Sequence, residues 1–257
     1  MPVFNEAATV REIVSRVLAV GLGADSLELI IVDDGSTDGT GEILGRLREE
    51  HSEISRESPL DFARGTPSGR ALGTSPSFEG RVGSRELKIL RHPTNLGKGQ
   101  SIRDALEHAT GDVIVIQDAD LEYDPRDFPR LLEPIKSGRA SVVYGSRILG
   151  HAKMSHLRYY LGGRFLSLLT NLLYGSHITD EPTCYKMFRR GVLDHFDLAA
   201  QRFDFCPEFT AKVLKAGYEI VEVPIRYNPR KIREGKKIRW TDGLAAIFTL
   251  LRLRFQK

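Results

Sequence analysis

The stretch Val113-Ile114-Val115-Ile116-Gln117-Asp118-Ala119-Asp120 decides which fold we expect for this chain. Its first four residues are apolar and predict a strand. Two acidic residues, one position apart, follow where that strand ends. Because ligands of open parallel sheets bind beyond the carboxyl ends of the strands, the sequence predicts a binding site that contains Asp118 and Asp120.

Helical and strand patterns alternate on both sides of this stretch. Before residue 145 the apolar periodicity predicts strands and helices in turn, with strands at 27–32, 87–90, 113–117 and 141–144 and helices at 10–18, 39–49, 98–108 and 125–137. Such alternation indicates an α/β protein with a mostly parallel sheet flanked by helices. Further elements, which we interpret as a continuation of the same domain, are expected as helices at 157–173, 206–216 and 240–255 and strand-like segments within 179–188 and 218–225.

We interpret residues 1–225 as one domain and residues 226–257 as a basic C-terminal loop followed by an amphipathic helix. Within the domain, residues 52–85 are rich in Ser, Gly, Arg and Pro, and we expect a flexible insertion there. The first helix should follow a strand, yet only Met1-Pro2-Val3-Phe4 is available for it. We therefore expect that most of the first strand is missing, and the sequence leaves open whether the native start lies upstream.

The basic residues of the chain are concentrated at its C-terminal end. The net charge is only +3, but residues 226–257 hold ten Lys and Arg residues against Glu234 and Asp242. A basic end of this kind can face anionic lipid, phosphorylated substrate or nucleic acid, or it can be a solvated tail. No recognised nucleic-acid motif and no basic patch interleaved with aromatic residues occurs, so we expect no nucleic-acid partner.

The remaining composition indicates a cytoplasmic protein. Cys184 and Cys206 match no metal-ligand spacing and suit a reducing compartment. No signal peptide is recognisable, and the best apolar run, 244–251, is far shorter than the roughly 20 residues of a membrane-spanning helix. We therefore expect any membrane contact to be peripheral, at the inner face of the membrane.

The last predicted helix is amphipathic. One face gathers its apolar side chains, with Arg252 and Arg254 beside them, and consists of Leu244, Ile247, Phe248, Leu251 and Phe255. Such a helix can lie on an anionic membrane surface, or it can pack against the core.

Asp118 and Asp120 are candidate ligands of a divalent cation. Mg²⁺ and Mn²⁺ prefer oxygen ligands and are often shared with substrate phosphates, and a cation here would stabilise a diphosphate leaving group. Glu122, two positions further along, can add a ligand. The alternative is a polar loop that caps the following helix, because acidic residues after strands are common.

Two further loops carry polar groups near predicted strand ends or helix starts. In Asp33-Asp34-Gly35-Ser36 a carboxylate can accept hydrogen bonds from a base or a ribose, although the same residues can form a capping turn. In Asn95-Leu96-Gly97-Lys98-Gly99 the glycines permit close approach, and Lys98 can meet a phosphate at a helix N-terminus. The spacing is not that of a P-loop, and no Gly-x-Gly-x-x-Gly follows the first strand, which disfavours a dehydrogenase.

Taken together and in this order, the motifs resemble those of the family 2 glycosyltransferases, which have the GT-A fold. The matching segments are Pro2-Val3-Phe4-Asn5-Glu6, Val32-Asp33-Asp34-Gly35-Ser36, Asn95-Leu96-Gly97-Lys98-Gly99, Asp118-Ala119-Asp120 and Gly145-Ser146-Arg147. Within that family the chain looks most like the dolichyl- or polyprenyl-phosphate hexosyltransferases, such as the dolichol-phosphate mannose synthases. The resemblance covers nearly the whole chain apart from residues 52–85.

The resemblance implies roles on the donor side. In the family, the first segment and the second Asp of the Asp-Asp pair hold the nucleoside, and the matching residues here are Pro2, Phe4, Glu6 and Asp34. A later loop with Arg-Gly-x-Ser-Lys covers the donor in the mannose synthases. Its nearest counterpart here is 233–237, which keeps Arg233 but lacks the serine and displaces the glycine, so the resemblance leaves the donor open.

The resemblance also implies the cofactor and the acceptor residues. The Asp-x-Asp motif and the residue two positions beyond it hold the metal in the family, which implies Mg²⁺ or Mn²⁺ on Asp118, Asp120 and Glu122. The arginine of Gly-Ser-Arg and another on the following segment bind a lipid phosphate. The matching residues are Arg147 and Arg158, with Arg164 as a rival for the second.

Two acidic residues of the second half have less defined implied roles. Asp180 lies in a segment that resembles Asp-Pro-x-Ser-Gly-Phe, and it would orient an arginine or line the acceptor pocket. Glu208 lies on the expected following helix, where a direct role and a structural role are both open.

The implied reaction is transfer of a single hexose, with mannose favoured, from a nucleotide-diphosphate sugar to a polyprenyl or dolichyl phosphate. The donor would be GDP-mannose or UDP-glucose. We expect inversion by single displacement without a strong general base, because a phosphate monoester with a second pKa of about 6 is already a nucleophile near pH 7. The Gln-x-x-Arg-Trp motif of processive synthases is absent, since Ile238-Arg239-Trp240 lacks the glutamine.

Three alternatives stay open on the sequence alone. The first keeps the fold and changes the substrates, either to UDP-glucose and undecaprenyl phosphate or to a hydroxyl acceptor in cell-envelope polysaccharide synthesis. The second is a nucleotide-sugar-binding protein without turnover. The third is a nucleic-acid binder that uses the basic C-terminal region.

Overall fold

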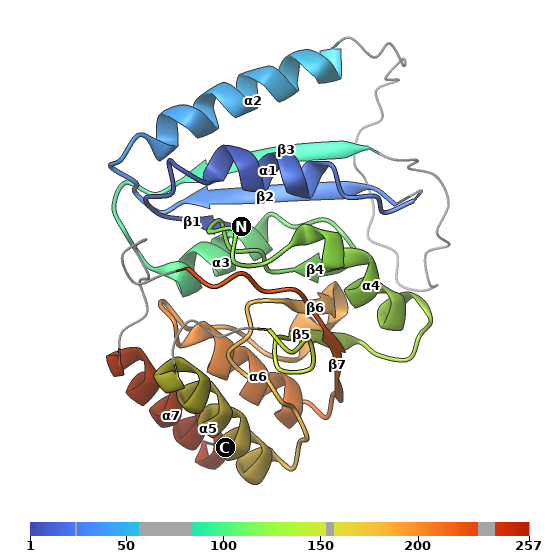
Figure 1. Ribbon diagram of the computed structural model, residues 1–257, viewed down its shortest axis with the longest axis vertical. Helices are drawn as coiled ribbons and strands as arrows, with labels where there is room; N and C mark the ends of the chain where they lie inside the picture. The colour runs from blue at the N-terminus through green and yellow to red at the C-terminus, as the bar shows by residue number, and fades with distance from the viewer. Residues whose placement is uncertain (24, 57–83, 153–156, 231–239, 257) are drawn as a thin grey trace, which may run out of the picture.

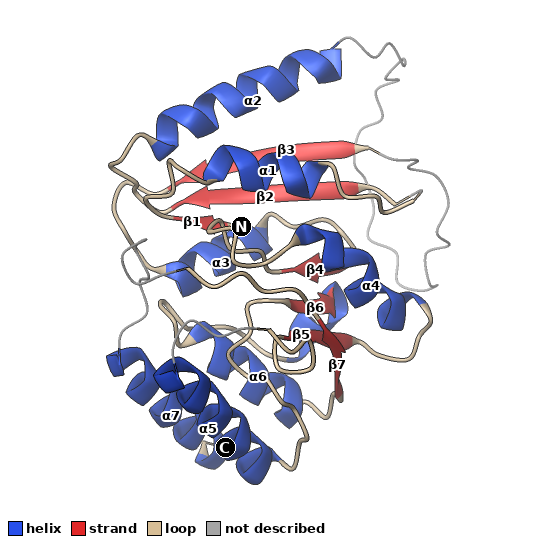
Figure 2. Cartoon of the chain, viewed as in Figure 1, coloured by secondary structure: helices blue, strands red, loops and turns tan. Residues whose placement is uncertain are grey.

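Two sheets flanked by helices make up the computed structural model, which describes residues 1–23, 25–56, 84–152, 157–230 and 240–256 (Figures 1 and 2). In chain order the elements are β1 (Pro2–Val3), α1 (Val10–Leu18), β2 (Leu27–Asp33), α2 (Thr40–Arg56), β3 (Arg85–Arg91), α3 (Lys98–Glu107), β4 (Val113–Val115), η1 (Pro125–Asp127), α4 (Phe128–Lys136), β5 (Val142–Ser146), α5 (Leu157–Tyr174), β6 (Lys186–Arg189), η2 (Arg190–His195), α6 (Phe205–Lys215), β7 (Ile220–Pro224) and α7 (Trp240–Phe255).

The first sheet is wholly parallel and has the strand order β1-β2-β3. Its central strand, β2, buries Ile31 and Val32 completely, as expected for a strand covered on both faces. β2 ends at Asp33, and Asp34 follows directly, so both aspartates lie at the carboxyl end of this strand. β1 is as short as predicted, since only Pro2 and Val3 pair with β2.

The second sheet is mixed and has the order β4-β6-β5-β7. β5 and β7 are parallel, but β6 runs antiparallel to both β4 and β5, which the prediction of a mostly parallel sheet did not include. The reason is where the chain re-enters the sheet. After α5 it returns to the carboxyl end of β5, where the Thr179 hydroxyl lies 2.7 Å from the Ser146 hydroxyl. From that end the next strand can only run backwards.

Both ends of the segment 52–85, for which we predict a flexible insertion, belong to regular elements. Residues 52–56 complete α2, and Arg85 opens β3. The Arg85 guanidinium donates to the carbonyls of Leu18 and Val20 at 3.1 and 3.0 Å, which ties the start of β3 to the end of α1. What remains of the predicted insertion, 57–83, lies outside the described residues.

The helices α5, α6 and α7 pack together at the end of the molecule away from the first sheet (Figure 1). On α7 the core face consists of Ala246, Thr249, Leu250 and Leu253. The apolar face predicted from the sequence is a different one, and its members Leu244, Phe248 and Phe255 are exposed. Among the described residues, no helix has both the length and the apolar character that crossing a bilayer requires.

Candidate active site

The Asp-x-Asp motif follows β4 and lies at the edge of the second sheet. The pairing of β4 continues one residue past the strand, because the Ile116 amide donates to the Lys186 carbonyl at 3.2 Å. Burial, together with the charges of Asp118 and then Glu122, raises the pKa of Asp120 to about 7. The charge of Asp118 is thus one cause of the shift, and a metal site shared by the two aspartates remains a prediction.

Lys98 is the direct partner of Asp118. Its Nζ lies 2.6 Å from Oδ1 and 2.8 Å from Oδ2. Burial alone would raise the pKa of Asp118, but the ammonium of Lys98 lowers it. The sequence predicted a phosphate contact for Lys98, and the structure places it on the acidic motif. Its contact with a phosphate remains a prediction.

Gly97 determines where Lys98 stands. It precedes α3 with a φ of 103°, and a Cβ atom built on it would lie 2.3 Å from the carbonyl oxygen of Gln201. Only glycine combines a φ in this range with so close a backbone neighbour. Gly99 makes a similar approach, since a Cβ atom there would lie 2.7 Å from the carbonyl oxygen of Ala200, so two glycines allow this loop to pack against residues 200–201.

Asp34 holds the same loop from the other side. Its Oδ1 accepts from the Leu96 amide, and its Oδ2 accepts from the Gly97 amide, both at 2.8 Å. His92 Nδ1 lies 2.8 Å from Oδ1, and its Nε2 lies 2.8 Å from Asp104 Oδ2. The nucleoside role of Asp34 stays a prediction, while its observed role is to position the loop that carries Lys98. The sequence patterns did not single out His92, although it directly follows β3.

Glu122, the predicted third ligand, has two hydrogen-bond partners for its carboxylate in this structure. Its Oε2 accepts from the Tyr227 hydroxyl at 2.6 Å, and its Oε1 accepts from the Arg230 amide at 2.7 Å. In the part of the chain that the structure describes, no three His, Cys, Asp or Glu residues gather as a metal site. The paired carboxylates of Asp118 and Asp120 fit a hard cation whose other ligands come from substrate phosphates or water. The role of Glu122 as a metal ligand therefore stays a prediction.

Arg230 joins the first segment of the chain to the acidic motif. Its guanidinium contacts Glu6 at 2.5 and 3.1 Å and donates from Nε to the Asp120 carbonyl at 2.8 Å. Glu6 is buried and also accepts from the Thr9 hydroxyl at 2.7 Å. The sequence patterns did not single out Arg230. The only available signal was its place in Asn228-Pro229-Arg230, just before the loop that the resemblance matched.

The other predicted donor-side residues are placed without a test of their role. Pro2 lies in β1 opposite Val32, and Phe4 follows that strand. Arg233 lies outside the described residues. Their contacts with a nucleoside remain predictions.

Arg147 lies against Asp180 at the end of β5. Its Nε and Nη2 donate to the two carboxylate oxygens at 2.8 and 2.7 Å, and its amide donates to Oδ2 at 2.8 Å. The guanidinium also lies over the Tyr227 ring, 5.1 Å from the centroid. Asp180 therefore orients Arg147, one of the two roles that the resemblance left open for it.

The second predicted acceptor arginine is not brought to this pair. Arg158 is exposed at the start of α5 and lies 4.8 Å from the ring centroid of its neighbour Tyr159. Arg164, the rival residue, donates instead to the Thr179 carbonyl at 2.9 Å, next to Asp180. Of the two arginines on α5, Arg164 is the one that contacts the Asp180 segment among the described residues.

Glu208 has a structural role in this structure. Its carboxylate accepts from the amides of Ala199 and Ala200 and pairs with Lys212 at 2.7 Å. These amides begin the loop whose Gln201 carbonyl accepts from the Gln100 amide at 3.0 Å. Glu208 thus supports the start of α3 from a distance.

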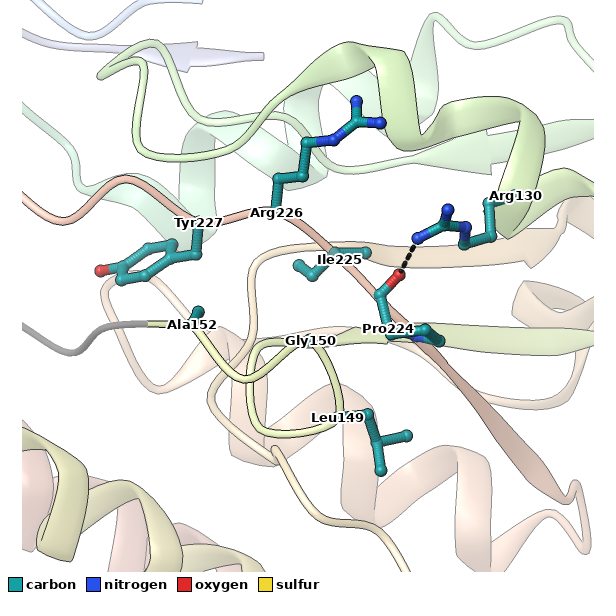
Figure 3. Close-up of a pocket in the computed structure, with 8 residues that line it drawn as sticks. All are labelled: Arg130, Leu149, Gly150, Ala152, Pro224, Ile225, Arg226 and Tyr227. Carbon is teal, nitrogen blue, oxygen red and sulfur yellow. Dashed lines mark hydrogen bonds between the residues drawn. The ribbon is translucent and has the colours of Figure 1, made fainter.

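A pocket of about 430 Å³ lies beside the Gly-Ser-Arg turn (Figure 3). It is lined by Arg130, Leu149, Gly150, Ala152, Pro224, Ile225, Arg226 and Tyr227. Arg130 donates to the Pro224 carbonyl at 2.9 Å, and Tyr227 is also the ring beneath Arg147. None of the residues predicted from the sequence lines it, so this pocket borders the predicted site and does not contain it.

The fold, together with the acidic residues that follow its strands, defines the class of protein: an α/β protein with the GT-A architecture. Residues 1–61 and 79–196 match the family model of "Glycosyl transferase family 2". The chain therefore belongs to glycosyl transferase family 2.

Curated relatives agree with that assignment. The chain is 31% identical over 146 residues to the low-salt glycan biosynthesis hexosyltransferase Agl6 of Haloferax volcanii, which covers 56% of this chain and 35% of that protein. It is 25% identical over 236 residues to the glycosyltransferase AglD of the same organism, covering 90% and 32%. With the undecaprenyl-phosphate 4-deoxy-4-formamido-L-arabinose transferase of Shewanella sediminis it shares 26% over 242 residues, covering 92% and 60%. The chain thus spans only part of the length of each.

Solved structures share the fold. Glucosyl-3-phosphoglycerate synthase from Mycobacterium tuberculosis, in complex with Mn²⁺, UDP-glucose and glycerol 3-phosphate, superposes with a TM-score of 0.61 at 18% identity, covering 98% of this chain and 77% of that one. The same enzyme with Mg²⁺ and UDP gives a TM-score of 0.63 at 18% identity, covering 98% and 76%. At this identity the likeness establishes the architecture alone.

Proposed function

We propose that this chain transfers a single hexose from a nucleotide-diphosphate sugar to a polyprenyl phosphate, with inversion and with Mg²⁺ or Mn²⁺. The observation that carries the proposal is that a pair of carboxylates and an arginine follow the carboxyl ends of two strands of the same sheet. The Asp118–Asp120 pair follows β4, and the oriented Arg147 follows β5. Membership of family 2 and the acceptor in the name of one relative support the same reading.

On the donor side, Asp118 and Asp120 would hold the cation. A divalent cation here supplies charge neutralisation for a diphosphate leaving group. Glu6 and Arg230 border the same loop, and their ion pair fixes the first segment against the Asp120 carbonyl. A fixed backbone at this point favours a repeatable position for the bound diphosphate.

On the acceptor side, Arg147 would bind the lipid phosphate. Asp180 uses two of the five guanidinium N–H donors, and the donors that remain can meet phosphate oxygens. The Asp180 pair and the Tyr227 ring hold the guanidinium in one orientation, which suits recognition of a planar pair of oxygens. Arg158 is the second predicted contact, and its exposed position on α5 leaves it accessible to a lipid headgroup.

The proposed reaction is a single displacement. A phosphate oxygen attacks the anomeric carbon while the bond from that carbon to the diphosphate oxygen breaks, so the configuration inverts. Because a phosphate monoester is largely ionised near pH 7, with a second pKa of about 6, no carboxylate has to remove a proton from it. Mannose from GDP-mannose is the favoured donor sugar. The altered loop at 233–237, which lacks the expected serine, makes glucose from UDP-glucose the second candidate.

We further propose that the faces of α5 and α7 rest on the inner surface of the membrane, where a polyprenyl phosphate would be found. Large apolar side chains stand exposed on these two packed helices: Leu157, Leu161, Phe165, Leu168, Leu172, Trp240, Leu244, Phe248 and Phe255. Exposed apolar surface of this extent marks an interaction site. Arg252 and Arg254 lie among the exposed residues of α7, a charge that favours an anionic leaflet.

The test is incubation with GDP-mannose or UDP-glucose, polyprenyl phosphate and Mg²⁺ or Mn²⁺, followed by mass spectrometry of the lipid. We expect one hexose per lipid with the inverted anomeric configuration. Asp120→Ala should abolish the product while keeping the circular dichroism spectrum of the parent. A retained configuration would overturn the mechanism.

Parallel reactions separate the alternatives. A product formed only on a hydroxyl acceptor would replace the lipid-phosphate acceptor and keep the family assignment. The chain could bind a nucleotide sugar but release no nucleoside diphosphate with either donor and either cation. That result would favour a binding protein over an enzyme.

A further inference from the structure

Lys98 covers the carboxylate that the proposed function assigns to a divalent cation. Its Nζ lies within 2.8 Å of both oxygens of Asp118. Each side chain is 19% exposed, so the pair is largely shielded from water. A cation that uses Asp118 must therefore share these oxygens with an ammonium or replace it.

Sharing is electrostatically unfavourable. An ammonium and a divalent cation on one carboxylate would lie only a few ångströms apart, and like charges at such a distance repel strongly when water is largely excluded. The nearby carboxylates do little to reduce this repulsion. Glu122 already accepts from Tyr227 and Arg230, and the Arg230 guanidinium donates to the backbone carbonyl of Asp120.

Lys98 has a second destination. It is the first residue of α3, a helix of ten residues at whose start two amides already have acceptors, since Gly97 donates to Asp34 and Gln100 donates to the Gln201 carbonyl. Its ammonium stands on a flexible four-carbon side chain, which can swing from Asp118 toward a phosphate bound beside it. A diphosphate bound beside the Asp-x-Asp motif would supply such a phosphate, and its negative charge attracts both the Lys98 ammonium and a metal ion.

We propose that Lys98 is an exchangeable counter-ion that couples cation binding to diphosphate binding. Its ammonium neutralises Asp118 until a diphosphate attracts it, and the oxygens that it leaves then become available to Mg²⁺ or Mn²⁺. This inference rests on the proposed function and deepens it. The coupling is reciprocal, so the cation must strengthen diphosphate binding by the same factor as the diphosphate strengthens cation binding.

The proposal predicts that removing the charge of Lys98 raises the affinity for Mn²⁺ alone. Lys98→Met should bind Mn²⁺ alone about tenfold more tightly than the parent, within the usual range of coupling between sites. The effect of a nucleoside diphosphate on Mn²⁺ affinity should shrink in that variant. If Lys98 only contacted the donor, the substitution would weaken nucleotide binding and leave the affinity for Mn²⁺ alone unchanged.

The experiment is a Mn²⁺ titration followed by electron paramagnetic resonance of the free ion, with and without UDP or GDP, at pH 8. The Mn²⁺ complex of the nucleotide itself is measured without protein and subtracted. Lys98→Gln, which keeps a hydrogen-bond donor for Asp118 but not the charge, is the second variant and should behave as Lys98→Met does. Lys98→Arg keeps the charge and should stay close to the parent.

Lys88→Met is the matched control, because Lys88 also pairs with a carboxylate, that of Glu28 at 2.5 Å, but on β3. It should leave both Mn²⁺ affinities unchanged. Unchanged affinity for Mn²⁺ alone in folded Lys98→Met and Lys98→Gln would overturn the coupling while the proposed function stands. Absence of any Mn²⁺ binding by the parent, even with both nucleotides, would overturn the cation in the proposed function and the coupling with it.

Discussion

Asp180 holds Arg147 through both carboxylate oxygens, across 33 residues of sequence and at the point where β5 ends. The aspartate is itself held by β7, because Glu222 accepts from the amides of Thr179 and Asp180 at 2.7 and 3.0 Å. The direction of the Arg147 guanidinium is therefore set by three segments that meet only in the folded chain.

Asp180→Asn should loosen Arg147 and destabilise the protein. A buried guanidinium without its carboxylate is costly, and we expect the free energy of unfolding to fall by about 3 kcal/mol. The KM for polyprenyl phosphate should rise while the KM for the donor stays the same. Urea denaturation and steady-state kinetics measure the two effects. Asp194→Asn, at an exposed position, is the matched control. Equal changes in both KM values would show that Arg147 does not act on the acceptor.

The raised pKa of Asp120 makes stability and cation affinity depend on pH in opposite directions. Without added divalent cation, the folded chain keeps the Asp120 proton up to about pH 7, whereas the unfolded chain loses it near the usual value of 3.8. The contribution of protonated Asp120 to the stability of the fold is therefore fully present below about pH 4 and is lost as the pH rises through 7.

Cation binding requires the ionised carboxylate. We expect the Mn²⁺ affinity to fall about tenfold for each pH unit below 7 and to level off above it. Thermal melts without cation and Mn²⁺ titrations between pH 5 and 8 check both trends. Asp120→Asn should remove this pH dependence from the melts, and an affinity that is flat across the range would contradict the placement.

Gly97→Ala should destabilise the fold and disturb the site together. The new methyl would meet the Gln201 carbonyl at a φ of 103°, and we expect a loss of about 3 kcal/mol or more from strain and overpacking. Because the Gly97 amide also binds Asp34, the position of Lys98 should change with it.

Gly45→Ala is the control for that substitution. Gly45 lies inside α2, and a Cβ there meets nothing within 4 Å. We expect a gain of about 1 kcal/mol from helix propensity. Urea denaturation of both variants compares them, and a Gly97→Ala protein as stable as its parent would contradict the observed backbone.

Leu172→Glu combined with Phe248→Glu should weaken binding to membranes. These residues are 80% and 65% exposed on α5 and α7, so the substitutions should leave the melting temperature unchanged. Sedimentation with vesicles that contain anionic lipid should recover several-fold less of the variant than of the parent. Arg252→Gln with Arg254→Gln should lower recovery mainly at low salt, because screening already removes that attraction at high salt. Parent protein that stays in the supernatant would contradict membrane docking.

The sequence by itself determined the elements that depend on local patterns. Apolar periodicity placed α5 and α7 within one residue of their observed ends, since each helix shows its repeat in a single window. The apolar run that begins at Val113 placed Asp118 and Asp120 after a strand in the same way. These features depend on residues that are neighbours along the chain.

Only the tertiary structure decided which partners these residues have. Glu6 and Arg230 are 224 residues apart, and no periodicity records that they pair. The same holds for Glu122, which turns to Tyr227 and Arg230, for Lys98 on Asp118, and for β6, whose reversed direction follows from where the chain re-enters the sheet. Side-chain partners and strand direction depend on packing between distant segments, which a local pattern of apolar and charged residues does not encode.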